Sequence, residues 1–66
     1  MSPKRFAVRL RTIRTRRGMT QEALATKVGV SRAYLARLEM GRHDPPLSRL
    51  RKLAKALGAS VAELVG

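Results

Sequence analysis

Two arginines on one face of a short helical segment, Arg32 and Arg37, are the side chains in this sequence best suited to specific chemistry. At about 100° per residue in a helix, Arg32, Ala33 and Arg37 fall within roughly 140° of one another. Leu35 and Leu38 occupy the opposite face. A guanidinium is a planar fork of donors that matches O6 and N7 of guanine, and small neighbours allow close approach in the major groove. The spacing therefore predicts a helix that contacts base edges, in preference to a merely solvated face.

Residues for other kinds of chemistry are few. The chain has no cysteine and one histidine, His43, which we expect in an exposed loop, and its acids (Glu22, Glu39, Asp44 and Glu63) are scattered. Disulfides and cysteine–zinc sites are excluded, and no phosphate-binding loop or nucleophile motif is present. We therefore expect no enzyme activity, no catalytic residue, no metal, no cofactor and no small-molecule substrate.

Charge predicts a polyanionic partner. Fifteen lysines and arginines against four aspartates and glutamates give a formal net charge of +11 at pH 7. The content of hydrophobic residues, 44%, argues against a disordered basic tail. Phe6 and Tyr34 are the only aromatic residues, too few for stacking the bases of single strands. Charge and aromatic content together therefore favour duplex nucleic acid as the partner.

Length and hydropathy predict one small domain, residues 1–66, and a cytoplasmic location. No apolar run approaches the roughly 20 residues of a membrane span, and the N-terminus lacks the pattern of a signal peptide. A cationic membrane-active peptide would need one long amphipathic helix with a broad apolar face. Several short segments separated by glycines argue against that class, so we expect no membrane partner.

Capping residues and apolar spacing predict an all-α chain of five helices. N-capping or helix-starting residues precede each apolar stripe, and glycines follow most of them. The helices are expected to begin around Ser2, Thr20, Ser31, Leu47 and Ser60, and to end at Gly18, Gly29, Met40 to Gly41, Gly58 and the C-terminus. The apolar stripes include Phe6, Leu10 and Ile13; Leu24, Ala25 and Val28; Val30, Leu35 and Leu38; and Leu47, Leu50, Leu53, Ala54 and Leu57. Gly29 supplies the positive φ of a tight turn between two helices.

Three stretches, residues 10–25, 28–41 and 50–64, give the sequence its resemblance to the Cro/C1-type helix-turn-helix repressors, the xenobiotic-response-element family of bacterial and phage regulators. The resemblance implies a compact five-helix, lambda-repressor-like DNA-binding domain with the helix-turn-helix at helices two and three. It also implies a sequence-specific, nucleoid-associated transcriptional regulator, either a repressor or a small autoregulatory controller. Such a protein is expected to bind a palindromic operator as a homodimer.

The same resemblance assigns roles to single positions. Ser31, Arg32, Ala33 and Arg37 match positions that face base edges, and Gln21, Tyr34 and Arg42 match positions that contact phosphates. Met40 and Pro46 depart from the family pattern, where polar residues are common, so the phosphate contacts at those two sites are not expected.

Arg14 has two expected roles. Together with Glu39 it matches a pair that in this fold forms an ion pair, although two independent surface charges are the alternative. Some arginines of the first helix, among them Arg5, Arg9 and Arg14, are also expected to face phosphates. The sequence leaves two alternatives for the basic residues of the fourth helix, contact with the flanking DNA backbone or with solvent alone. These residues are Arg49, Arg51, Lys52 and Lys55.

The C-terminal apolar residues Val61, Leu64 and Val65 are the expected dimer surface, with a role as a cap on the core as the alternative. Two other functions remain open. Charge alone permits a non-specific architectural nucleic-acid-binding protein, and a helix-turn-helix chain can also act as an antitoxin-type DNA-binding partner, although no toxin-neutralising tail is evident.

Overall fold

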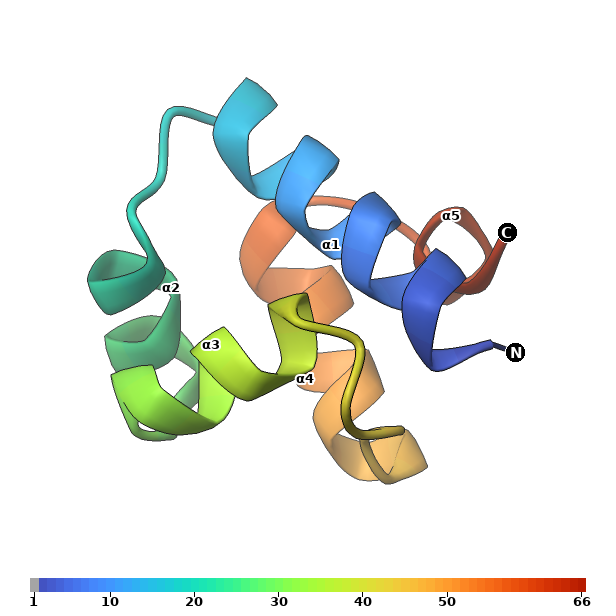
Figure 1. Ribbon diagram of the computed structural model, residues 1–66. Helices are drawn as coiled ribbons and strands as arrows, with labels where there is room; N and C mark the ends of the chain where they lie inside the picture. The colour runs from blue at the N-terminus through green and yellow to red at the C-terminus, as the bar shows by residue number, and fades with distance from the viewer. Residues whose placement is uncertain (1) are drawn as a thin grey trace.

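Five α-helices make up the regular secondary structure of residues 2–66, the part of the chain that the computed structural model describes. They are α1 (Pro3–Arg16), α2 (Gln21–Val28), α3 (Arg32–Glu39), α4 (Leu47–Leu57) and α5 (Val61–Val65) (Figure 1). The all-α prediction and the expected helix ends are confirmed to within one or two residues.

Hydroxyl side chains begin four of these helices. Each accepts a hydrogen bond from the backbone N–H three residues later and so satisfies a donor that has no partner within the helix. The pairs are Ser2 with Arg5, Thr20 with Ala23, Ser31 with Tyr34, and Ser60 with Glu63. At α4 the capping residue is Pro46, which makes no such side-chain bond. The first turn of α4 therefore lacks a side-chain cap.

The helices enclose one hydrophobic core to which all five contribute. Its fully buried large side chains are Phe6, Leu10, Leu24, Leu35, Leu38, Leu53, Leu57 and Leu64. Helix α2 packs on α3 and α4, while α1 packs on α3 and α5. Figure 1 shows α5 beside the N-terminal half of α1. The molecule measures 24 × 22 × 20 Å.

Two details of the expected core differ from the structure. On α1 the buried stripe continues from Phe6 and Leu10 to Arg14, one turn on, and Ile13 lies half-buried beside it. On α4 the side chain of Leu47 is exposed, because it lies at the first residue of the helix, before the helix meets its neighbours. None of the helices in residues 2–66 is long and apolar enough to cross a membrane.

Candidate nucleic-acid interface

The turn between α2 and α3 fixes the two helices of the predicted helix-turn-helix relative to each other. Gly29 adopts φ 84°, a left-handed conformation that glycine reaches without steric cost. The N–H groups of Gly29 and Val30 both donate to the carbonyl oxygen of Ala25, at 2.9 and 3.0 Å. This bonding satisfies the end of α2 and reverses the chain within three residues.

The solvent face of α3 carries the four residues predicted to face base edges. Ser31, Arg32, Ala33 and Arg37 are all exposed. Neither arginine forms an ion pair with any acid in the described chain, so both guanidinium groups are available. The hydroxyl oxygen of Ser31 already accepts from the N–H of Tyr34 at 3.0 Å. Toward a ligand, Ser31 therefore presents its O–H as a donor.

Tyr34 lies half-buried at the edge of α3 and holds positively charged groups around its ring. The guanidinium carbon of Arg49, from α4, is 4.7 Å from the ring centroid, and that of Arg37 is 6.0 Å away. The ring of His43 stacks at 6.4 Å between centroids, with 19° between the planes. Cation–π attraction thus draws Arg49 to the side of α3. Its role was left open by the sequence, because no local pattern indicates which neighbour an α4 side chain meets.

Glu39, at the end of α3, accepts hydrogen bonds from two other helices. Arg14 on α1 donates from Nε to Oε2 at 2.6 Å and from its terminal NH2 group to Oε1 at 3.0 Å. Gln21 on α2 donates from Nε2 to Oε1 at 3.1 Å. The expected ion pair between Arg14 and Glu39 is confirmed. Charge-assisted, forked bonds of this kind hold α3 in place against α1 and α2.

The phosphate contact expected of Arg14 does not fit its position. Arg14 is only 9% exposed, and its remaining terminal nitrogen donates to the carbonyl oxygen of Met19 at 2.7 Å. The hydrogen bond to Glu39 raises the pKa of the Arg14 guanidinium above its ordinary value, so the group stays charged within the fold. Three of its five N–H donors bind inside the protein and little of the side chain is exposed, so Arg14 is poorly placed to hold a phosphate.

A hollow of about 320 Å³ lies between α1, α2 and α3 beside this network. Its lining residues are Arg11, Arg14, Gln21, Ala36, Glu39 and Met40. Gln21 is half-buried at the first residue of α2, and Arg11 and Met40 are exposed. Arg11 was not among the expected site residues. The basic residues of α1 predicted that some of them face phosphates, but only the packing of α1 on α3 places Arg11 beside Gln21.

The remaining predicted residues lie in two places. Arg42 is exposed in the loop after α3, and its N–H donates to the carbonyl oxygen of Arg37 at 3.3 Å. At the C-terminus, Val61 and Val65 are half-buried against the core. Leu64 is 0% exposed, so its assignment to a dimer surface was wrong. A helix of five residues buries one side chain completely, and here that side chain is Leu64.

Comparison with known proteins gives consistent results. A sequence model of the helix-turn-helix family (HTH_3) matches residues 10–64. The immunity repressor protein of Bacillus phage phi105 is 47% identical over 58 residues, which are 88% of this chain and 40% of that protein. An uncharacterized HTH-type transcriptional regulator of Sinorhizobium fredii, y4dJ, is 45% identical over 80% of this chain and 69% of its own length.

Among solved structures, the restriction-modification controller protein C.AhdI from Aeromonas hydrophila superposes with a TM-score of 0.91 at 38% identity. The match covers 96% of this chain and 91% of that one. The chain thus spans less than half of the phage repressor and almost all of the controller protein.

Proposed function

Since the chain belongs to the Cro/C1-type helix-turn-helix family, whose members carry a DNA-binding helix-turn-helix, we propose that it is a sequence-specific regulator of transcription. In this proposal the chain acts either as a repressor or as a small autoregulatory controller. The observation that carries the proposal is the exposed face of α3, where Arg32 and Arg37 stand unpaired beside small side chains.

In this proposal α3 enters the major groove. Arg32 and Arg37 donate to O6 and N7 of guanines, the commonest specific contact in that groove. Ser31 donates its O–H to a base or phosphate acceptor while its oxygen accepts the capping bond from Tyr34. Ala33 lies against a thymine methyl group and lets the helix backbone approach.

Phosphate contacts on both sides of α3 orient the domain. Gln21 keeps a second amide hydrogen after donating to Glu39, and it lies at the N-terminus of α2, where the helix dipole favours an anion. Arg11 is placed to share that phosphate across the hollow. Tyr34 and Arg42 contact DNA phosphates on the other side of α3. Arg49, which lies against the ring of Tyr34, contacts the same stretch of DNA backbone.

The size of the domain supports a homodimer on a palindromic operator. Its longest dimension is 24 Å, whereas half-sites on one face of B-DNA repeat at about 34–36 Å. One domain therefore covers one half-site. Within the C-terminal set, Val61 and Val65 remain as contact residues, and Leu64 supports them from the core.

The test is selection from a random duplex DNA pool at near-physiological salt with competitor DNA, followed by sequencing. A two-fold symmetric motif supports the proposal, and sedimentation with the selected duplex should show two chains per site. An unsymmetric short motif contradicts the dimer alone. Equal survival of all sequences contradicts sequence-specific regulation and supports the architectural alternative, in which the +11 charge binds any duplex.

A further inference from the structure

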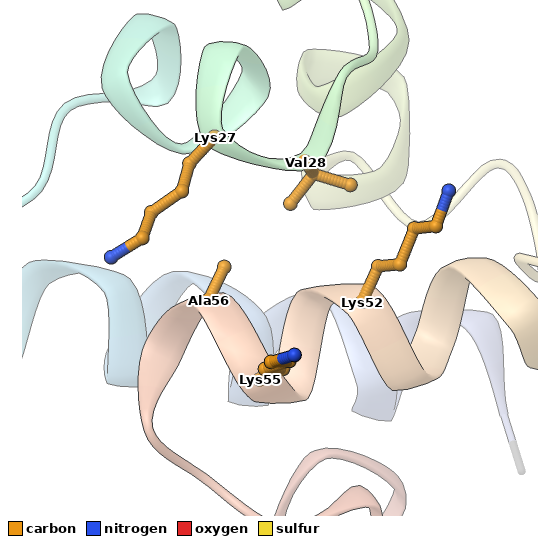
Figure 2. A pocket seen from close by; sticks show the side chains of 5 residues that line it. All are labelled: Lys27, Val28, Lys52, Lys55 and Ala56. Atoms are coloured by element: carbon orange, nitrogen blue, oxygen red, sulfur yellow. The ribbon is translucent and has the colours of Figure 1, made fainter.

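An open groove of about 470 Å³ separates the C-terminal end of α2 from the second half of α4. Its lining residues are Lys27, Val28, Lys52, Lys55 and Ala56. Figure 2 shows Val28 and Ala56 facing the space between the two helices, with Lys27 descending from α2 and Lys52 rising from α4. The groove thus has an apolar floor and a positively charged rim.

The rim gathers three of the chain's four lysines, the fourth being Lys4. No acid lines the groove, and none of the three forms an ion pair with another of residues 2–66. Placement in the last turn, where a cation stabilises the helix dipole, accounts for Lys27 and Lys55. It does not account for Lys52, which lies one turn earlier and completes the rim.

The groove is separate from the surface proposed to bind DNA. None of the residues proposed to contact bases or phosphates lines it. Lys27 is six residues beyond Gln21, about 9 Å along the axis of α2. On α4, Arg49 approaches the ring of Tyr34 from α3, and Lys52 lies three residues later, about 4.5 Å further along the helix axis.

The apolar floor identifies the class of occupant. Val28, a core residue that is still 9% exposed, and the half-buried Ala56 are extended by the aliphatic arms of the lysines, and this surface gains by being covered with aliphatic groups. The sugar–phosphate backbone of DNA supplies charge but no aliphatic side chains. A peptide that carries both carboxylates and aliphatic side chains complements the rim and the floor together.

We propose that this groove between α2 and α4 is a docking surface for an acidic segment of a partner protein that also carries aliphatic side chains. The segment lays an aliphatic side chain on Val28 and Ala56 and pairs its carboxylates with the three lysines. This inference does not rest on the proposed DNA sequence specificity, because it uses a different face of the domain.

The experiment titrates the full chain with a fluorescent peptide of glutamates and leucines at helical spacing, in low salt, and with a matched peptide in which serines replace the leucines. Fluorescence polarisation gives the affinities, and amide chemical shifts locate the bound peptide. The test variant combines Lys27→Gln, Lys52→Gln and Lys55→Gln. The control variant removes the same charge at exposed arginines elsewhere, combining Arg5→Gln, Arg16→Gln and Arg51→Gln.

We expect shifts confined to the groove and tighter binding of the leucine peptide than of the serine peptide. The lysine variant should weaken that binding about tenfold, since each exposed ion pair is worth a small factor in affinity, while the control changes it much less. Ala56→Glu, which places a carboxylate in the floor, should weaken it as well. Circular dichroism confirms that each variant remains helical.

Five results overturn the proposal. If the leucine peptide does not bind, the proposal has no basis. If the lysine and arginine variants lose peptide affinity equally, only the net charge of the domain acts. Shifts at Arg32 and Arg37 mean that the peptide imitates DNA on α3. A lysine variant that loses duplex DNA affinity as strongly as peptide affinity reassigns the groove to the DNA backbone, and identical groove shifts with inorganic phosphate reassign it to a small anion.

Discussion

Removing either partner of the Arg14–Glu39 ion pair should destabilise the domain far more than removing both. The two side chains are 10% and 4% exposed, and they share two hydrogen bonds. Loss of one partner from a buried pair leaves an uncompensated charge, which costs about 3–5 kcal/mol. A chain of 66 residues has a net stability of roughly 3–10 kcal/mol, so either single change consumes much of it.

The measurement is a double-mutant cycle with Arg14→Met and Glu39→Gln, two changes that keep side-chain volume while removing charge. The double variant buries no charge in this place and loses mainly the bond from Arg14 to Met19, so it should cost only about 1–3 kcal/mol. The coupling energy, which is the sum of the two single losses minus the double loss, is therefore expected to be at least about 3 kcal/mol. Urea unfolding followed by circular dichroism, with sucrose present so that all four proteins fold, gives each free energy.

Losses that add to within about 0.5 kcal/mol would refute the reasoning, because independent surface charges add. A second readout connects the pair with function. Each single variant should bind the selected duplex less tightly even under conditions in which it is fully folded, since the hydrogen bonds at position 39 then hold α3 less firmly against its neighbours.

Three further predictions concern other parts of the fold. Arg37→Ala should cost about 1–3 kcal/mol on the selected duplex and relax the preference at one base pair, measured by competition binding; equal loss on all sequences would make Arg37 a phosphate contact. Gly41→Ala should destabilise more than Gly29→Ala in thermal unfolding, because both sites have positive φ but only at Gly41 does the new Cβ lie 3.3 Å from the backbone of α1. Bonds from the α5 N-cap lower the pKa of Glu63 below its ordinary 4.5, so its contribution is complete above that pH and is lost as pH falls through the lowered pKa. The stability difference between the native chain and Glu63→Gln should therefore shrink in acid. A difference that stays constant with pH would contradict a stabilising bond from the Ser60 N–H to the Glu63 carboxylate.

Helix number and helix ends follow from local chemistry, and the sequence accordingly predicted them. Ser31 and Ser60 begin helices through bonds within three residues, and Gly29 ends one through its own φ. The exposed face of α3 was predictable for the same reason. Its opposite side must bury Leu35 and Leu38, which leaves Arg32 and Arg37 outside.

Positions that depend on a neighbouring helix were predicted less well. Arg14 follows Phe6 and Leu10 at intervals of four residues, and that spacing was the available signal for burial. A basic residue in such a stripe needs a buried acid from another part of the chain. The tertiary structure decides which acid pairs with it. The burial of Leu64 and the stacking of Arg49 on Tyr34 likewise depend on how α5 and α4 pack.

The hydrogen bond between Gln21 and Glu39 has a consequence for the shape of DNA. It joins the start of α2, proposed to hold a phosphate, to the end of α3, proposed to contact bases. Because the two contacts are tied together, the distance between them is fixed. The domain therefore fits only one spacing between the DNA backbone and the base edges. Duplexes whose stiffness or groove width resists that spacing must deform, and the cost depends on their sequence. Base pairs that no side chain touches, near the centre of an operator, should therefore alter affinity.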